Sequence, residues 1–245
     1  MVDHIDWDVT IVGGGVAGRT AGIFTARHGL STVILSAGSP LLRRNAHLEN
    51  FPGFPHGVNA RLLLDMMKEQ AREAGCRFVD ATVTDVEPHE VGFNIDTDRG
   101  ETYHSKYVIA ATKNDVDYLE AIDGVELIDR GKRFVETTNG GRTGVRGLYA
   151  AGRIAEKPHQ AIIAAGHGAE VGVSLLEDDD RPFYHDWVAP DRYFTGRGRD
   201  VPPGCEEIDE EARRARERIG HEAMREYFRE LHPDTPEQHP SVPDD

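Results

Sequence analysis

The chain has 245 residues, enough for one large α/β domain or two small ones. Its net charge of −15 excludes nucleic acid as a partner, because phosphates would be repelled by this surface. No apolar stretch approaches the roughly 20 residues that span a bilayer, and no secretory signal is visible, so we expect a cytoplasmic protein without a membrane segment.

Lysine is scarce: 5 of the 28 basic residues are lysine and the others are arginine. Abundant acid with little lysine is typical of halophilic proteins, whose self-repulsion is screened by salt. An ordinary acidic cytosolic protein is the alternative.

A glycine-rich fingerprint opens the chain. Residues 9–12 predict a buried parallel strand and residues 14–28 predict a helix, with Gly13 at the turn between them and Gly15 and Gly18 at the start of the helix. Gly13 permits a tight turn, Gly15 permits close approach of the backbone to a pyrophosphate, and Gly18 permits close helix–strand packing. We therefore expect a dinucleotide whose phosphates meet the helix N-terminus; a glycine-rich turn without a ligand is the alternative.

A second strand is predicted at Thr32–Leu35 and is followed by a long irregular segment, residues 36–57. In NAD enzymes this strand usually ends in Asp or Glu, which binds the ribose, whereas here the position is Ser36. Ser36 therefore disfavours a simple NAD dehydrogenase. A structureless connection of this length inside a domain commonly contacts a ligand.

The middle of the chain predicts a helix and a small sheet. Apolar residues at helical spacing predict a helix over residues 59–74, which Gly75 ends. Three β-like runs follow, at residues 77–86, 91–96 and 102–111, and predict an antiparallel meander whose last run joins the central sheet.

Two more strands are predicted, at residues 133–137 and 147–151, before a helix over residues 159–176 that is rich in Ala and Gly. Small residues allow a flat ligand to approach a helix, although tight helix–sheet packing explains them equally well. No metal site is predicted, because none of the 12 histidines forms an HxxxH or HExxH pair.

We divide the chain into a domain of residues 1–177 and an acidic extension of residues 178–245. The extension combines an aromatic patch, a charged helix over residues 206–231, and a Pro-rich end, residues 232–245, that is predicted to be disordered. It serves either as a cover for the sheet or as an arm of a homodimer, and the sequence leaves both open.

Three further motifs identify a family. They are Glu-Asn-Phe-Pro-Gly at residues 49–53, Val-Ile-Ala-Ala-Thr at residues 108–112, and Thr-Gly-Val-Arg-Gly-Leu-Tyr-Ala-Ala-Gly at residues 143–152. Together with the fingerprint and the His159-Gln160 pair, they resemble the flavin domain of low-molecular-weight thioredoxin reductases over about residues 5–177.

This resemblance implies an α/β, Rossmann-like FAD-binding domain, with a parallel central sheet, helices and a small antiparallel meander, plus a C-terminal helical extension. It implies FAD as cofactor, with a helix N-terminus at Gln160 directed at the flavin. The cofactor-binding residues that it implies are Gly13, Gly15, Val16, Ala17, Gly18, Ser36, Asn50, Val83, Ala111, Thr112, Gly152, Arg153, His159, Gln160 and Ala161.

The sequence also differs from this family in several ways. Only about 20 residues separate Thr112 from Arg133, too few for the family's nicotinamide-binding domain. The redox CxxC is absent with that domain. Lys113 stands where the family usually has Gly, and Arg153 stands where it usually has the Asp that bonds the ribityl chain.

The sequence therefore predicts an FAD-dependent oxidoreductase without a nicotinamide domain or dithiol of its own. NADH or NADPH would act as a diffusing donor, or a partner protein would supply electrons; the acceptor and the catalytic residues are not specified. A non-catalytic flavin or nucleotide carrier or regulatory protein is the alternative, and an NAD(H)-binding protein is a weaker third hypothesis.

Overall fold

The computed structural model describes residues 6–239, 241 and 242. Contacts divide the chain into two units, Met1–Leu175 together with Thr235–Asp245, and Leu176–Asp234. The division into domains at residue 177 stays a prediction about independent folding. The grouping of Thr235–Asp245 with the first unit has no counterpart in the sequence analysis.

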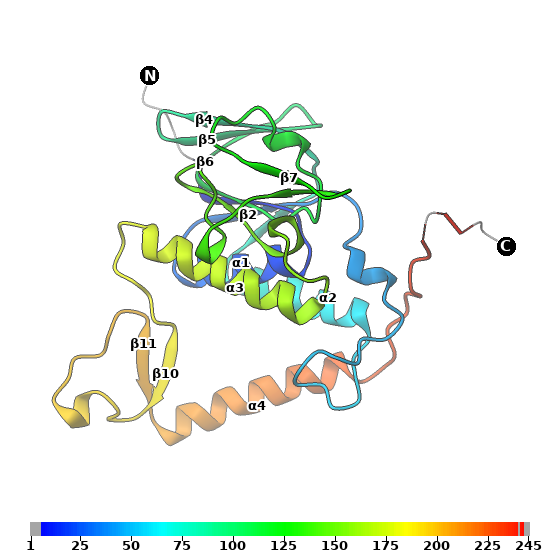
Figure 1. Cartoon of the computed structure of the whole chain (residues 1–245). Helices are drawn as coiled ribbons and strands as arrows, with labels where there is room; N and C mark the ends of the chain where they lie inside the picture. The colour runs from blue at the N-terminus through cyan, green and yellow to red at the C-terminus, as the bar shows by residue number, and fades with distance from the viewer. Residues whose placement is uncertain (1–5, 240, 243–245) are drawn as a thin grey trace. The chain divides into compact units, whose positions relative to one another are not determined.

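The first unit is built on a seven-stranded mixed sheet (Figure 1). Its strands are β1 (Trp7–Val12), β2 (Thr32–Leu35), β3 (Arg77–Val79), β4 (Val83–His89), β5 (Gly92–Thr97), β6 (Thr102–Ala110) and β9 (Leu148–Ala150). The order is β3-β2-β1-β6-β5-β4, with β9 paired to the C-terminal half of β6. Strands β3, β2, β1, β6 and β9 are parallel, and β4-β5-β6 form the predicted antiparallel meander.

Three helices, α1 (Val16–Arg27), α2 (Ala60–Glu73) and α3 (Ala161–Asp178), lie below the sheet in Figure 1. Helix α1 lies close to the strands at Gly22, where an added Cβ would stand 3.0 Å from the Cδ1 of Ile34. The opposite face of the sheet is buried in an apolar cluster, which joins Val12, Leu35 and Phe93 of the sheet to Leu119. Burial on both faces explains why β1 and β2 are continuous apolar runs.

The run predicted as one strand at residues 77–86 is two strands. Strand β3 pairs in parallel with β2, whereas β4 pairs antiparallel with β5, so the chain changes its partner between them. A hairpin of β7 (Leu127–Asp129) and β8 (Arg133–Val135) follows. Strand β7 was not predicted, and β8 was predicted two residues longer.

Helix α2 follows the prediction closely. The Asn59 side chain accepts hydrogen bonds from the backbone N–H groups of Arg61 (2.9 Å) and Leu62 (3.2 Å), and so caps the helix. Gly75 ends it with φ +108°, a conformation that favours glycine.

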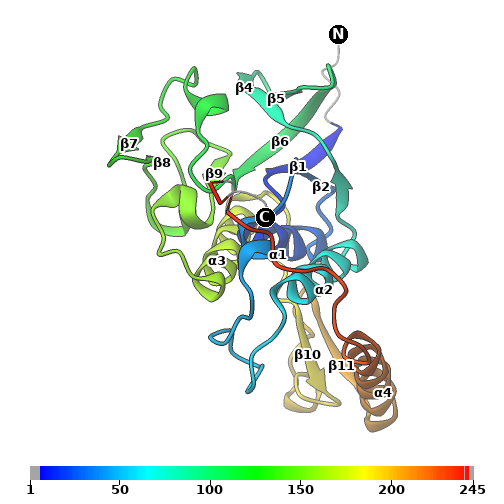
Figure 2. The ribbon, with the colours of Figure 1, turned by 90° about the vertical axis from the view of Figure 1, so that its right-hand side faces the viewer.

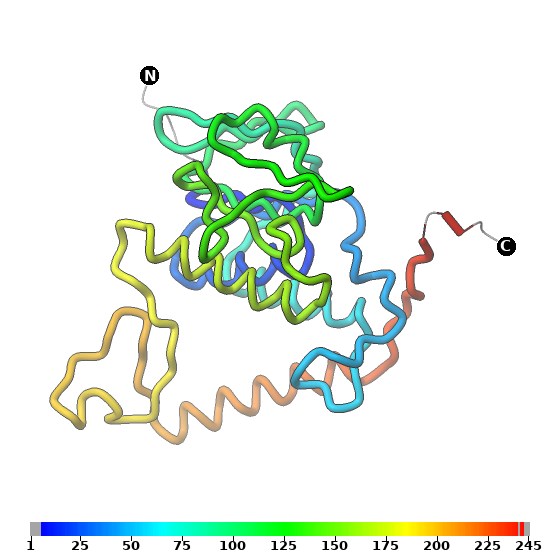
Figure 3. The backbone as a smooth tube through the Cα atoms, in the orientation of Figure 1, coloured from blue at the N-terminus to red at the C-terminus, as the bar shows by residue number. Residues whose placement is uncertain are grey.

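The long connection between β2 and α2, traced in Figure 3, has little regular structure. It contains one 3₁₀ turn, Leu41–Arg44, and a bridge between Leu48 and Val58. The Arg61 guanidinium, in a residue only 2% exposed, donates to the backbone oxygens of Asn45 (2.7 Å), Ala46 (3.2 Å) and Arg43 (3.3 Å). Arg61 therefore fixes a segment that has no strand or helix to satisfy its carbonyls.

The second unit contains a parallel pair of strands, β10 (Trp187–Pro190) and β11 (Cys205–Ile208), and helix α4 (Glu210–Tyr227). The strands were not predicted; the helix was predicted several residues too long at both ends. The predicted aromatic patch comprises Phe183, Tyr184, Trp187, Tyr193 and Phe194, of which the last three are in edge-to-face contact.

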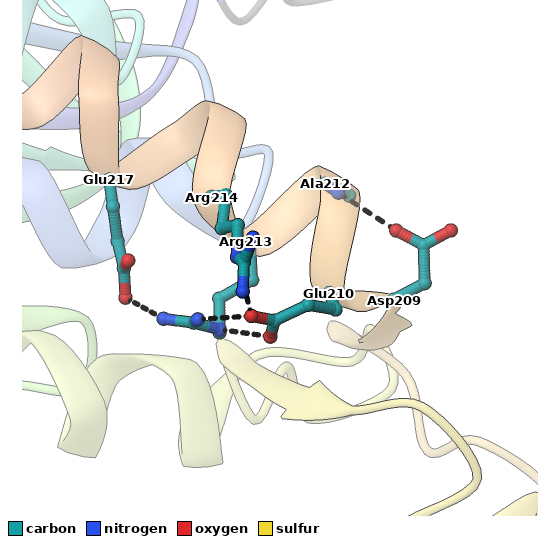
Figure 4. A network of polar contacts seen from close by, with 6 residues as sticks. All are labelled: Asp209, Glu210, Ala212, Arg213, Arg214 and Glu217. Carbon is teal, nitrogen blue, oxygen red and sulfur yellow. Dashed lines mark hydrogen bonds and ion pairs between the residues drawn. The ribbon is translucent and has the colours of Figure 1, made fainter.

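Helix α4 begins with ion pairs on its exposed surface (Figure 4). Asp209 accepts a hydrogen bond from the N–H of Ala212 at 2.8 Å, and Glu210 binds both Arg213 and Arg214. Arg213 also binds Glu217. These are the i,i+3 and i,i+4 pairs that the alternating charges predict.

The disorder of the Pro-rich end stays a prediction. Glu237 accepts a hydrogen bond from the Nε of Arg43 at 2.9 Å, and both residues belong to the first unit. Residues 240 and 243–245 of this predicted segment lie outside the described residues. Across the part of the chain that the structure describes, no helix is long and apolar enough to cross a membrane.

Candidate cofactor site

The carboxyl ends of four parallel strands meet at one edge of the sheet. Gly13 follows β1, Ser36 follows β2, Ala111 follows β6, and Ala151 follows β9. The N–H of Ala111 donates to the Val12 oxygen at 2.7 Å, which continues the sheet to its end. Beyond this edge lies a cavity of about 610 Å³, a size within the ~300–1,000 Å³ of typical ligand sites and at the position where open α/β sheets bind ligands.

Most of the residues predicted to bind a cofactor line this cavity. They are Gly13, Gly15, Val16, Ala17, Ser36, Asn50, Val83, Ala111, Thr112, Arg153, His159, Gln160 and Ala161. Two predicted residues, Gly18 and Gly152, are buried and do not line it. The structure thus brings together residues that are up to about 150 positions apart in the sequence.

The three glycines of the fingerprint have different surroundings. Gly13 has φ +111°, and a side chain there would lie against the Ala111 backbone. An added Cβ at Gly18 would overlap the carbonyl oxygen of Gly13, so Gly18 serves packing. At Gly15 an added Cβ would meet nothing within 4 Å, because that position faces the open cavity.

Two helices begin at the cavity. Helix α1 has Gly15 at its N-cap, and no side chain caps it, so its first N–H groups are available to a ligand. Gln160 stands just before α3, and its side-chain oxygen accepts a hydrogen bond from Asn50 Nδ2 at 2.9 Å. This bond ties the long connection to the start of α3.

The backbone of Gly152 is hydrogen-bonded to a buried histidine. Its N–H donates to Nδ1 of His167 at 2.9 Å, and His167 is 4% exposed. Burial, and secondarily the charge of Lys157, lowers the pKa of His167 to about 4. The imidazole is therefore neutral at pH 7, which leaves its Nδ1 free to accept this bond.

Arg153 lies in the wall of the cavity. Its guanidinium stands 4.8 Å from the centre of the Phe134 ring, and one of its nitrogens donates to the Lys157 oxygen at 3.1 Å. An arginine has no acceptor atom, so it makes a different contact from the aspartate that the family usually has here.

A turn after β6 forms another part of the wall. The Thr112 hydroxyl donates to the Asp115 oxygen at 2.6 Å and lies 2.9 Å from the Tyr118 hydroxyl. Burial raises the pKa of Tyr118 above its ordinary value, so the phenol is neutral. Tyr118 and Asp115 follow a strand end, which was the available signal, but the sequence analysis did not select them.

Further lining residues were also missed by the sequence analysis. Most of them stand beside strand ends or in the long connection: Val12, Gly14, Leu35, Ala37, Ser39, Pro40, Leu41, Leu42, Asn45, Leu48, Ala81, Thr82, Lys113, Ala151, Pro158 and Ala164. His47 of the long connection is exposed outside this lining, and its Nε2 lies 3.1 Å from the His56 oxygen.

The cavity fits FAD on its own features. An uncapped helix N-terminus and a glycine that leaves space in front of it suit a pyrophosphate, and the cavity continues from there both toward Ser36 and toward Gln160. The start of α3 offers a second positive helix end, which suits the negative charge of a reduced flavin.

Comparisons with known proteins also indicate an FAD-binding domain. The sequence profile of the FAD binding domain family matches residues 8–49. The chain is 32% identical over 135 residues to a bifunctional thioredoxin reductase/thioredoxin of Mycobacterium leprae, a match that covers 54% of this chain and 30% of that protein. It is 25% identical over 188 residues to a thioredoxin reductase of Rickettsia felis, which covers 76% of this chain and 60% of that protein.

Solved structures show the same fold. A thioredoxin reductase from Gloeobacter violaceus superposes with a TM-score of 0.67 at 19% identity, over 76% of this chain and 100% of that chain. A thioredoxin reductase from T. acidophilum superposes with a TM-score of 0.65 at 19% identity, over 71% of this chain and 99% of that chain. The chain spans less than two thirds of the length of the two curated relatives named above. The chain thus contains a thioredoxin reductase-like, Rossmann-type FAD-binding domain, and FAD is its cofactor.

Proposed function

We propose that the protein is a flavin-dependent oxidoreductase that holds FAD in the cavity at the strand ends. The observation that carries the proposal is the convergence of the glycine loop, the ends of β1, β2, β6 and β9, and the start of α3 on one cavity. Bound FAD supplies hydride and single-electron transfer. The protein's residues bind and orient it.

The two ends of the cavity suit different halves of FAD. In dinucleotide-binding folds the pyrophosphate lies at the first glycine loop, and the residue at the end of the second strand meets the adenosine ribose. This assigns the Ser36 end of the cavity to the adenosine half. The flavin half then occupies the end lined by Thr112, Arg153, His159 and Gln160.

The electron donor in this proposal is a diffusing NADH or NADPH or a protein partner. The sequence contains no CxxC, and Cys76 is buried, which raises the pKa of its thiol to about 12 and leaves it unreactive. The protein therefore does not reduce thioredoxin through a dithiol of this chain.

Absorption spectroscopy of the purified chain tests the proposal. We expect a yellow protein whose flavin absorbance is bleached anaerobically by NADH or NADPH and returns with an acceptor. Yellow protein that neither nicotinamide nor candidate protein donors bleach would favour a flavin carrier. Colourless protein that cannot be reconstituted with FAD would contradict the proposal.

We also propose a cytoplasmic, salt-adapted protein that binds neither nucleic acid nor membranes. Its support is the net charge of −15 and the scarcity of lysine. A homodimer through the acidic extension is part of this proposal, because Ile219 and Met224 of α4 are 68% and 43% exposed. Sedimentation at several protein concentrations tests the dimer.

A further inference from the structure

Two cations line the flavin end of the cavity, and a third stands in a neighbouring hairpin. Lys113 and Arg153 line it, and Lys132 stands in the turn of the β7–β8 hairpin, which Figure 2 shows beside β9. All three lie near His159: burial and then the charges of Arg153, Lys113 and Lys132 lower the pKa of that imidazole. His159 is therefore neutral at pH 7 and adds no positive charge of its own.

These cations lack acidic partners. Among the described residues, no carboxylate lies within 4.0 Å of Lys113, Lys132 or Arg153. Some arginines of the first unit do have acidic partners, in the ion pairs Arg43–Glu237, Arg72–Glu69, Arg99–Asp80, Arg130–Glu156, Arg133–Asp117 and Arg133–Glu120.

The absence of acidic partners matters because the chain has more acidic than basic residues. The chain has 43 acidic and 28 basic residues, and two of its five lysines belong to this group of three. Asp115 is the one carboxylate in the cavity lining, and its side chain is exposed. A locally positive surface on a chain of net charge −15 concentrates anions at that place.

The structure holds the backbone at Lys113 and the side chain of Arg153 in position. Lys113 has φ +71°, a left-handed conformation that is strained for a non-glycine residue. The bonds of Thr112 to Asp115 and Tyr118 fix this turn. The Phe134 ring and the Lys157 oxygen hold Arg153. A lysine thus occupies a cavity wall where glycine would be unstrained.

The pyrophosphate of FAD does not account for this charge, because the uncapped N-terminus of α1 and the Gly15 loop receive it. We propose that Lys113, Lys132 and Arg153, here named the cationic rim, admit an anionic redox substrate, bearing phosphate or carboxylate, to the flavin. This inference rests on the proposed function and adds the chemical class of its substrate.

Stopped-flow kinetics on the full FAD-loaded chain test the rim at low ionic strength. The reduced protein is mixed with ferricyanide, a trianion, or with neutral p-benzoquinone. One anionic reduced flavin gives two electrons to two ferricyanide ions and releases one proton; benzoquinone takes both electrons, that proton and a second proton from water. Reduction of the oxidised protein by NADPH and by NADH, which differ by one phosphate, is followed separately.

The variants are Lys113→Gly, Lys132→Gln and their combination. Lys113→Gly relieves the left-handed strain, so its melting temperature should equal or exceed that of the wild type. Lys68→Gln is the matched control, since it removes a lysine of the same unit that lies on α2, outside both the cavity lining and the β7–β8 hairpin. The control should leave both rate ratios unchanged.

We expect the double variant to lose at least five-fold in one ratio of rates. A fall in the ratio of the ferricyanide rate to the benzoquinone rate indicates that the anionic substrate is the electron acceptor. A fall in the ratio of the NADPH rate to the NADH rate indicates that it is the electron donor. No fall in either ratio, in protein that binds FAD, overturns the inference alone. Failure of the wild-type chain to bind FAD overturns the proposed function and the inference with it.

Discussion

Gly15 and Gly18 differ in what a side chain would meet, although both belong to one motif. The backbone at Gly15 is extended, with φ −76° and ψ −171°, which any residue adopts, and the space before it is open. Gly18 touches the Gly13 carbonyl. Ligand binding and packing are therefore separable at these two positions.

Gly15→Val should abolish FAD binding and leave the fold intact, because its branched side chain enters only the cavity. Bound FAD per chain and circular dichroism measure the two effects. Gly18→Ala is the contrasting variant: it should lower the melting temperature, since its Cβ overlaps the backbone. Normal flavin content in folded Gly15→Val would refute the placement of the pyrophosphate.

His167 should make stability depend on pH. Its folded pKa of about 4 lies below the ordinary value near 6.5, so folding favours the neutral form. This contribution to the free energy of unfolding is complete above pH 6.5 and is lost as the pH falls from 6.5 toward 4. The expected loss is about 3 kcal/mol, since the two pKa values imply about 1.4 kcal/mol for each pH unit between them.

Urea unfolding at a series of pH values measures this contribution. His167→Asn is the matched variant, because its side-chain oxygen can accept the Gly152 N–H and does not titrate. The variant should lack the additional decline between pH 6.5 and 4. Parallel curves for the two proteins would show that His167 does not sense pH.

At the scale of elements, what could be predicted follows from burial and turn chemistry. Strands β1 and β2 are apolar runs buried on both faces, and the cap of α2 is encoded locally by Asn59 and Gly75. Strands β7, β10 and β11 have three or four residues, too few for a periodic pattern, so their pairing depends on distant partners.

Arg61 shows why part of the site could not be predicted. An arginine in the first turn of a helix is ordinarily solvated, yet here it is buried beneath the connection and bound to three carbonyls. Only the tertiary fold brings these carbonyls to it. By contrast, the cavity residues that follow strand ends could be found from the topology rule alone.

Arg61→Met should destabilise the protein by about 3 kcal/mol, because the carbonyls of Asn45 and Ala46 lose charged donors. It should also weaken FAD binding, since Asn45 lines the cavity. Chemical denaturation and FAD titration measure these effects. Arg72→Met, on the same helix with an exposed ion pair, should cost under about 0.5 kcal/mol. Equal losses in both variants would contradict the role given to Arg61.

At the scale of the whole molecule, charge is unevenly distributed along the chain. Residues 177–245 hold 20 acidic and 10 basic residues, which is −10 of the net −15. Ion pairs such as those on α4 offset only part of this repulsion.

Raising KCl from 0.1 M to about 2 M should therefore raise the melting temperature, because the Debye length falls from about 10 Å to under 3 Å and the repulsion is screened. Differential scanning calorimetry measures it, with sucrose as an uncharged control for solvent effects. A melting temperature that is flat or falls with KCl would contradict salt adaptation.

The most direct test of the account is the number of FAD molecules bound per chain, measured by equilibrium dialysis of the flavin-stripped protein with FAD. The cavity at the strand ends predicts one FAD per chain in the wild type and none in Gly15→Val. Saturable binding of NADH without binding of FAD, or equal FAD binding by the two proteins, would contradict it.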